Sequence, residues 1–485
     1  MSSTLLLAIV LGYFALLFVI AHITKGKNAG NENFFLGGRK SPWMVVAFGM
    51  IGASLSGVTF VSVPGWTMKT GMTYMQTVFG FAAGYIFIAK ILLPLYYRLQ
   101  LTSIYSYFKG RLGTYSYKSA ASFFILSKTI GAAARLYIVT YILQVYILDP
   151  WGIPYVVTAA ATLILIWAYT FQGGIKTIVW TDTLQTFCMF GTLILIIVSV
   201  VQHLNFSPAQ LVTTITESPY STVFDWDWQS PRFFWKQFLS GIFITIAMSG
   251  LDQDMMQKNL SCRSLKEAQK NMYWYGGAFI PANLLFLVLG ILLITLSNAQ
   301  GIPLPAKGDE LLPSFAATGM LGQATVIFFI IGIIAAAFSS ADSALTALTT
   351  SFCIDILGIE QNDMLKAKKT RMTVHVTITL LFIFIMLLFN VLNISSIIDS
   401  IYIIASYTYG PLIGLFAFGL FTKRGTLDKA VPFICILSPL LCFAFERVIT
   451  TFTDYKFGYE LILINGFITF AGLWLFSKKS NIAWK

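Results

Sequence analysis

Long apolar runs recur along nearly the whole chain, separated by short segments that carry most of its charge. Each run is about 20 residues long, the length that an α-helix needs to cross the hydrocarbon core of a bilayer. This pattern predicts thirteen spanning helices, over Leu5–Ile23, Trp43–Met68, Tyr74–Tyr97, Ala120–Leu148, Pro154–Phe171, Ile178–Val201, Phe233–Met256, Met272–Leu296, Leu321–Ile356, Thr373–Leu392, Ile397–Phe421, Ala430–Ile449 and Glu460–Phe476. We therefore predict an all-α polytopic membrane protein in which residues 1–485 form a single transmembrane domain.

The composition supports this class. Of the 485 residues, 57% are hydrophobic and only 11% are charged, and a soluble core cannot hide so much apolar surface. Leu5–Ile23 is not expected to be a signal peptide, because no basic residue precedes it and no small-residue cleavage site follows it. The five cysteines show no paired spacing and the three histidines are scattered, so neither a disulfide framework nor a metal centre is expected.

The distribution of basic residues predicts the orientation in the membrane. The net charge of +12 comes from lysines and arginines in short connections, which indicates a lipid bilayer rather than nucleic acid as the partner. Connections on one side hold twenty-three of them and those on the other side hold six. Since the basic side faces the cytoplasm, we expect an outer N-terminus and a cytoplasmic C-terminus in a plasma membrane, the inner membrane of a bacterium. Lys258 is counted here in an inner connection.

Two predicted spans carry small and polar residues near their middles. One contains Gly52–Thr59, and the other contains Asp252, Gln253 and Asp254. Unwound backbone at membrane depth survives only where protein or a water-filled cavity satisfies its polar groups. Broken helices at corresponding positions of two inverted halves indicate the binding sites of a transporter. Close helix packing is the alternative explanation of such small residues.

These two spans are five helices apart once the first helix is set aside. The pattern then predicts a five-helix repeat over residues 43–201, an inverted second repeat over 233–421, an extra N-terminal helix over 5–23 and two C-terminal helices over 430–476. This is a 5+5 architecture, in which the two broken spans are the first and sixth core helices.

The stretch Ala335–Cys353 is unusually polar for a spanning helix. Helical geometry places Ala336, Ser339, Ser340 and Ser343 on one face, with Asp342 beside them. That face offers carbonyl, hydroxyl and carboxylate oxygens, the ligands that hard cations prefer, and an ionisable residue inside a span indicates a functional site. The alternative is that the hydroxyls bond back to their own helix and Asp342 pairs with a neighbour.

Several motifs resemble the sodium:solute symporter family, which has the LeuT-type inverted-repeat fold. The likeness is nearest to the bacterial sodium/sialic acid transporters and more distant to the sodium/galactose transporter. It is carried by FFLGGR (Phe34–Arg39), SLSGVTFVSVPG (Ser54–Gly65), GGIKTIVWTDTLQ (Gly173–Gln185), QDMMQKNLSCRSLKEAQK (Gln253–Lys270) and AAAFSSADSALTALTTSFCIDI (Ala335–Ile356).

The resemblance implies two sodium positions. The main site would use the carbonyls of Gly52, Leu55 and Ala336 with the hydroxyls of Ser339 and Ser340. A second site, present in some members, would use Asp182, Ser339, Asp342 and Ser343. The chain departs from the family pattern at Asp342, where a serine is expected. This carboxylate could strengthen cation binding, carry a proton, or have a structural role only.

The solute-binding residues implied by the resemblance are Ser54, Ser56, Thr59, Tyr74, Gln76, Arg135, Asp252 and Gln253. Arg135 lies within an apolar span, where its planar guanidinium suits a substrate carboxylate; pairing with Asp252 or Asp254 is the alternative. Two departures weaken the sialic acid assignment. Val78 stands where a glutamine is expected, and Asp252 is acidic where relatives carry a neutral polar residue.

We therefore expect sodium-driven uptake of a small organic solute by alternating access, with one or two coupling Na+ ions. A sugar or sugar acid such as sialic acid is the favoured solute, and a monocarboxylate, vitamin or amino acid is the alternative. Proton coupling through Asp182 and Asp342 stays open. An enzyme is not expected, because no nucleophile–base pair or metal-ligand set lies at membrane depth, and a channel or sensor is a distant alternative. We expect the monomer to function.

Overall fold

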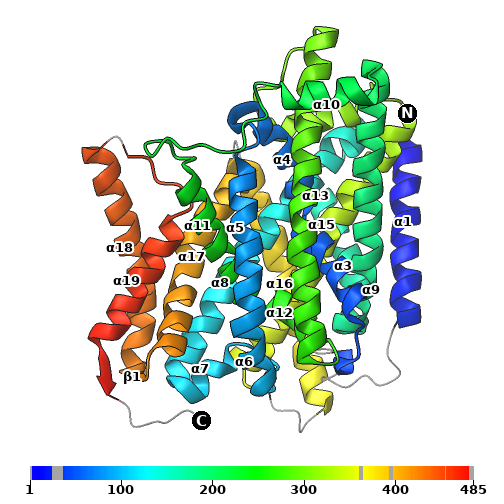
Figure 1. The fold of residues 1–485 in the computed structure, drawn as a ribbon. Coiled ribbons are helices and arrows are strands. Elements are labelled where there is room, and N and C mark those ends of the chain that lie inside the picture. The colour runs from blue at the N-terminus through cyan, green and yellow to red at the C-terminus, as the bar shows by residue number, and fades with distance from the viewer. Residues whose placement is uncertain (1–2, 25–36, 360–363, 393–396, 454, 480–485) are drawn as a thin grey trace.

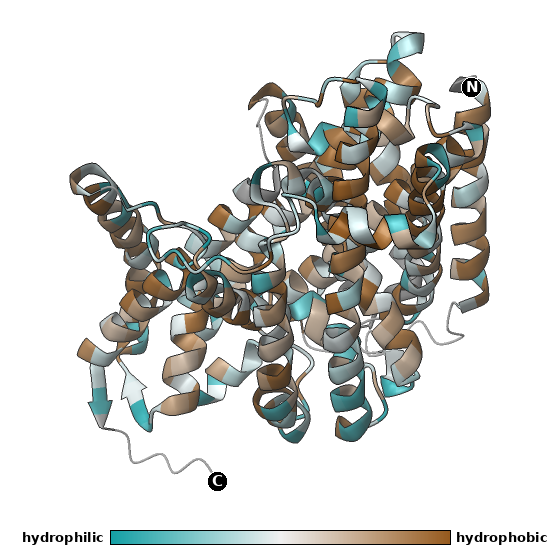
Figure 2. Cartoon of the chain, turned by 45° about the horizontal axis from the view of Figure 1, so that its top comes forward, coloured by the Kyte–Doolittle hydropathy of each residue, from teal (hydrophilic) through white to brown (hydrophobic). Residues whose placement is uncertain are grey.

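The chain folds into a bundle of long helices that run mostly along one direction (Figure 1). The computed structural model describes residues 3–24, 37–359, 364–392, 397–453 and 455–479. The motif Phe34–Arg39 therefore lies partly outside the described residues. Hydrophobic residues predominate in the middles of the helices and hydrophilic residues gather toward their ends (Figure 2). The predicted all-α class is confirmed.

The α-helices are α1 (Ser3–Thr24), α3 (Trp43–Ser54), α4 (Gly57–Thr70), α5 (Tyr74–Phe87), α6 (Leu93–Arg98), α7 (Ser106–Arg111), α8 (Thr114–Leu143), α9 (Tyr155–Leu204), α10 (Pro208–Thr216), α11 (Phe234–Thr245), α12 (Gln253–Leu260), α13 (Leu265–Gln300), α14 (Leu311–Ala316), α15 (Gln323–Ser351), α16 (Met364–Leu392), α17 (Ile397–Phe421), α18 (Val431–Phe452) and α19 (Leu461–Leu475). Short 3₁₀ or π-helical turns are η1 (Gly37–Arg39), η2 (Ile88–Leu92), η3 (Gln144–Leu148), η4 (Asp149–Trp151), η5 (Ile246–Gly250), η6 (Gly308–Glu310), η7 (Phe352–Ile356) and η8 (Asp428–Ala430).

The helices match the predicted spans in position. Among the described residues, nine helices are long and apolar enough to cross a membrane, and two bent pairs pass the same test as broken spans. Two shorter apolar helices, Tyr155–Thr170 and Leu461–Leu475, account for the remaining predicted ranges. Each of the thirteen predicted ranges overlaps one of these helices, and the number that cross the bilayer stays a prediction.

One boundary differs from the prediction. The helix α9 is continuous over Tyr155–Leu204, where two separate spans were predicted. Its 50 residues would extend about 75 Å if straight, more than twice the hydrocarbon thickness of a bilayer. Its two apolar parts, Tyr155–Thr170 and Ile175–Leu204, correspond to the two predicted spans.

A short β-ribbon is the other departure from the all-helical pattern. Strand β1 (Arg424–Thr426) pairs antiparallel with β2 (Ser477–Lys479), with Gly425 opposite Lys478. The buried guanidinium of Arg111 donates to the carbonyls of Gly419 and Arg424 at 3.1 and 3.0 Å, which fastens this end of α17. The ribbon lies at the end of the bundle opposite the start of α1 (Figure 1).

Close helix contacts bring the broken segment and the serine-rich helix together. Both α3 and α15 pack against α9. At Gly52 in α3, an added Cβ would lie 2.0 Å from the Oγ1 of Thr186 in α9. Only glycine permits this approach, so the sequence at the break allows α3 to touch the surface of α9 that carries Asp182.

Candidate sodium and solute sites

The first predicted break is present between α3 and α4, which meet at an angle of 56°. The Leu55 N–H donates to the Ile51 carbonyl at 2.8 Å, and the Phe60 N–H donates to the Ser56 carbonyl at 3.1 Å. Among the described residues, the carbonyls of residues 52–55 thus have no backbone donor four residues ahead. These four carbonyls belong to a predicted spanning segment, and at membrane depth free carbonyls are tolerated only if other groups satisfy them.

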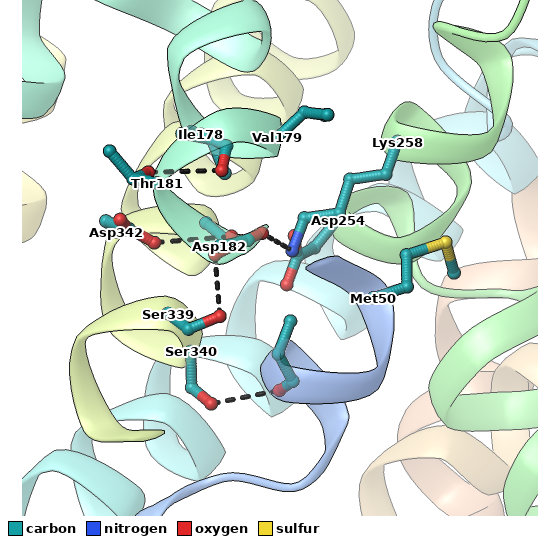
Figure 3. Close-up of polar contacts among 12 residues, drawn as sticks. Met50, Ile178, Val179, Thr181, Asp182, Asp254, Lys258, Ser339, Ser340 and Asp342 are labelled. Atoms are coloured by element: carbon teal, nitrogen blue, oxygen red, sulfur yellow. Dashed lines mark hydrogen bonds and ion pairs between the residues drawn. The ribbon is translucent and has the colours of Figure 1, made fainter. Parts of the chain in front are cut away.

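The serine face of α15 lies against this break (Figure 3). The Ser340 hydroxyl donates to the Ala53 carbonyl at 3.0 Å and makes a long 3.5 Å contact to the Ala336 carbonyl. The neighbouring Ser339 hydroxyl donates to an Asp182 carboxylate oxygen of α9 at 2.6 Å. Of the residues expected at the main sodium site, Ser340 thus contacts both the break, between Gly52 and Leu55, and Ala336 of its own helix, while Ser339 contacts Asp182. The carbonyl and hydroxyl oxygens of the expected residues are hard ligands that fit Na+ as a transported ion.

The second predicted break follows α11 and the π-helical turn η5, and the chain then enters α12 at an angle of 64°. The Asp252 carboxylate caps α12 by accepting from the backbone N–H groups of Asp254 and Met255 at 2.9 and 3.4 Å. An N-terminal carboxylate also interacts favourably with the helix dipole. Asp252 is thus placed by the geometry of the break itself.

A chain of buried ion pairs links the two breaks. The Lys258 ammonium lies 2.8 Å from Asp182 and 3.7 Å from Asp254. The Lys128 ammonium of α8 lies 2.7 Å from Asp254 and 3.1 Å from Asp252. Tyr409 of α17 donates to Asp252 at 2.8 Å. Every one of these lysine and aspartate side chains is at most 6% exposed, so each charge depends on its neighbours for compensation.

Asp342 has partners other than a lysine. It accepts from the Tyr169 hydroxyl of α9 at 2.8 Å and from the Ser343 hydroxyl at 3.3 Å. It also interacts electrostatically with Asp182 and Lys258. Figure 3 shows Asp342 beside Asp182. The four residues expected at a second sodium site, Asp182, Ser339, Asp342 and Ser343, therefore lie together around a region that Lys258 enters.

A cavity lies between the two breaks. Arg135 lines it, and among the described residues no carboxylate lies within ion-pair distance of its guanidinium. Its predicted alternative partners, Asp252 and Asp254, both form ion pairs with Lys128, and Arg135 interacts with Asp254 only at longer range. Aromatic side chains form much of the remaining wall, which includes Phe81, Tyr85, Phe279 and Tyr402. This mixed lining is typical of a small-molecule site.

Some predicted solute residues lie at this cavity. Ser54 lines it and shares a short hydrogen bond with the Tyr275 hydroxyl. Asp252 lines it through the paired carboxylate described above. Tyr74 lines a second cavity, named the outer cavity after the predicted orientation, and lies 3.3 Å, hydroxyl to hydroxyl, from Tyr402, which lines the first, inner one. The two cavities are thus separated by a layer of aromatic side chains.

Other predicted solute residues have structural partners instead. The Gln76 amide donates to the Arg232 carbonyl at 2.9 Å and accepts from the Asp225 N–H at 3.1 Å, which holds the connection between α10 and α11 in place. Gln253 accepts from the Ile104 N–H at 2.9 Å and donates to the Thr102 carbonyl at 2.8 Å. Ser56 and Thr59 are buried in and after the break but are not among the residues that line the inner cavity.

Sequence reasoning missed the residues that connect these sites. Lys258 was assigned to an inner connection, and this was wrong: it belongs to α12, its side chain is 1% exposed and it pairs with Asp182. The spacing of Asp254 and Lys258, four residues apart on a helix, could have indicated a partner for Asp254. Lys128 lies inside the predicted span Ala120–Leu148, and an ionisable residue there is a signal that could have identified it. No local signal identifies Tyr169 or Tyr409, because their partners lie on distant segments.

Two broken helices at membrane depth, with a hydroxyl-bearing helix against one break, define a secondary transporter of the inverted-repeat class. A family model described as "Sodium:solute symporter family" matches residues 34–431. The chain belongs to this family. It is an integral membrane protein that couples sodium to the movement of a small solute, and it is not an enzyme.

Relatives and solved structures agree with this assignment. The "Sodium/sialic acid symporter SiaT" of Proteus mirabilis is 26% identical over 440 residues, which cover 88% of this chain and 87% of that protein. The "Sodium/sialic acid symporter NanT" of Aliivibrio fischeri is 23% identical over 94% of this chain and 90% of that protein. The "Sodium-coupled monocarboxylate transporter 1" of Xenopus laevis is 26% identical over 51% of this chain and 39% of that protein.

A substrate-bound, outward-open structure of a Na+-coupled sialic acid symporter superposes with a TM-score of 0.84 at 22% identity, over 98% of this chain and 99% of that one. A nucleobase-cation-symport-1 family transporter superposes with a TM-score of 0.51 at 14% identity, over 92% of this chain and 93% of that one. The predicted LeuT-type fold is confirmed.

Proposed function

We propose that this symporter imports a solute that carries a carboxylate, with a sialic acid as the first candidate. The observation that carries the proposal is Arg135, a guanidinium on the wall of the cavity between the breaks with no carboxylate within ion-pair distance among the described residues. A planar guanidinium can hold a carboxylate through two parallel hydrogen bonds. Two relatives that match most of the chain are named for sialic acid.

A monocarboxylate is the second candidate. It would use the same Arg135 contact, and the relatives named for monocarboxylates match about half of this chain. The aromatic wall of Phe81, Tyr85 and Phe279 would accept a small apolar acid. The cavity also contains polar groups from Ser54, Ser249 and Thr245, which suit the hydroxyls of a sugar acid.

The main sodium site of the proposal consists of the carbonyls of Gly52, Leu55 and Ala336 and the hydroxyls of Ser339 and Ser340. Sodium bound there would hold the free carbonyls of the break in one arrangement. Ser54 lies inside the same break and lines the solute cavity, so sodium would order part of the solute site. Such coupling is reciprocal in binding free energy, and the solute would raise sodium affinity by the same factor.

The proposal includes an orientation. An outer N-terminus and a cytoplasmic C-terminus would place the outer cavity, with Lys69 and Arg232 on its wall, on the external side. Solute would pass from there through the aromatic layer of Trp66, Tyr74 and Tyr402 to Arg135. The protein would act as a monomer in a bacterial inner membrane.

Uptake by purified protein in liposomes tests the proposal. A radiolabelled sialic acid should accumulate under an inward sodium gradient, and not under a proton gradient alone. Arg135→Gln should lower apparent affinity about 10- to 100-fold, because a charge-assisted hydrogen bond contributes about 1.5–3 kcal/mol. Lys90→Gln is a control on a cation within a span that the inner cavity does not use.

The outcome identifies the solute class. If pyruvate competes with the labelled sialic acid better than an unlabelled sialic acid does, the monocarboxylate candidate replaces it. If Arg135→Gln leaves the affinity unchanged, the carboxylate contact is refuted.

A further inference from the structure

Lys258 occupies an unusual position for a lysine in a membrane protein. Its side chain is 1% exposed, and its ammonium lies 2.8 Å from one oxygen of Asp182. The other oxygen of Asp182 accepts the Ser339 hydroxyl at 2.6 Å. The ammonium makes a second, longer ion pair of 3.7 Å with Asp254. A lysine ammonium is a compact point charge, so it acts electrostatically on both carboxylates at once.

The oxygens around this ammonium are those of a cation site. Asp182 and Ser339 contact each other, and Asp342 lies beside them (Figure 3). Ser343 donates to Asp342 at 3.3 Å. Asp342 interacts electrostatically with both Asp182 and Lys258. A sodium ion bound to Asp182 would therefore lie within a few ångströms of a buried positive charge that cannot leave. Like charges at that distance in a medium of low dielectric constant repel strongly.

The buried charges can be counted for the solute-free state. The described cluster contains four carboxylates, on Asp182, Asp252, Asp254 and Asp342, and two lysines that pair with three of them. Arg135 at the cavity wall is the third cation. With all of these groups charged, one negative charge stays uncompensated before any ligand binds, and the carboxylate of the proposed solute would add one more at Arg135.

We infer that the buried Lys258 ammonium serves as a tethered second cation of this transporter, so that one sodium ion accompanies each solute. The inference rests on the proposed main sodium site. It assigns Asp182, Ser339, Asp342 and Ser343 to the surroundings of Lys258 instead of to a second transported ion. The lysine thereby determines the ion stoichiometry without contacting the solute.

Equilibrium binding of radioactive sodium to the purified full-length protein tests this inference. The wild type should bind one ion per chain, and Ser340→Ala should lower that binding at the same sodium concentration. Lys258→Arg keeps the positive charge and should also bind one ion. Lys258→Gln removes the charge and should bind two ions at saturating sodium, with the Hill coefficient for sodium-dependent uptake rising from about 1 toward 2.

Two results would overturn the inference. The first is two ions per chain in the wild type. The second is a folded Lys258→Gln protein that still binds one ion. If Lys258→Gln does not fold, the number of sodium ions bound per chain by the wild type and by Lys258→Arg still tests the inference, because two ions in either protein would overturn it. Failure of the proposed main sodium site can be distinguished from failure of the inference about Lys258, because Ser340→Ala would then bind sodium like the wild type. Failure of the solute assignment leaves the sodium counts unaffected.

Discussion

Replacing Gly52 by alanine tests how closely the sodium site depends on the contact between α3 and α9. The added Cβ would lie 2.0 Å from the Oγ1, 2.9 Å from the Cβ and 3.1 Å from the Cα of Thr186. Rotation of the Thr186 side chain could move Oγ1, but it cannot move the Cβ or the Cα. The two helices must therefore separate by several tenths of an ångström, and overpacking of this kind costs about 1–3 kcal/mol.

An opposing effect limits the loss of stability. Alanine is favoured over glycine inside a helix by about 1 kcal/mol, so we expect a net destabilisation between about 0 and 2 kcal/mol. The sodium affinity should fall further, because the displaced residue carries a proposed ligand carbonyl. Each 1 kcal/mol that falls on the sodium-bound state raises the half-saturating sodium concentration about fivefold. Thermal unfolding in detergent and sodium titration of uptake measure the two effects separately.

The chain offers a matched control and a rescue. Gly191 lies in α9, as Thr186 does. An added Cβ there meets nothing within 4 Å, so Gly191→Ala should be neutral or slightly stabilising. Thr186→Gly removes both side-chain contacts and should recover part of the sodium affinity of Gly52→Ala in a double-mutant cycle. If Gly52→Ala titrates with sodium like Gly191→Ala, the break is not positioned by this contact and the reasoning is refuted.

Two further predictions concern buried polar groups. Ser340→Ala should raise the half-saturating sodium concentration about 10- to 100-fold in uptake assays, since a hydroxyl bound to an ion contributes about 1.5–3 kcal/mol. The control is Thr170→Val, which deletes a buried hydroxyl bonded only to its own helix and should leave the half-saturating sodium concentration unchanged. Equal effects of the two substitutions would argue against the proposed main sodium site. Lys128→Met should lower the free energy of unfolding by about 3–5 kcal/mol because Asp252 and Asp254 lose their shared cation; a wild-type unfolding temperature would show that Lys128 is not their counter-ion.

The positions of the helices could be predicted because length and hydrophobicity are local properties of the sequence. The break at Leu55–Ser56 was also predictable, since glycine and serine at membrane depth leave few other solutions. The contacts of Gln253 were not, because its partners at residues 102 and 104 lie on a segment far away in the chain. The error on Lys258 has the same origin. A count of basic residues cannot distinguish a lysine that ends a helix in water from one that ends it in the bundle.

The two breaks and the buried ion pairs have different proposed roles in coupling, because they differ in how much new stabilisation sodium binding could give them. The ion pairs from Asp182 through Lys258 to Lys128 give each of the three carboxylates that they contain a cationic partner without any ligand. A ligand shifts an equilibrium only by its different affinities for the two states, and groups that are satisfied in both states provide little difference. The carbonyls of residues 52–55 have no backbone donors four residues ahead, and only Ala53 receives a hydroxyl from α15. In the proposed mechanism sodium would therefore gain most at the α3–α4 break, and the ion pairs would hold α8, α9 and α12 in the register that this gain requires.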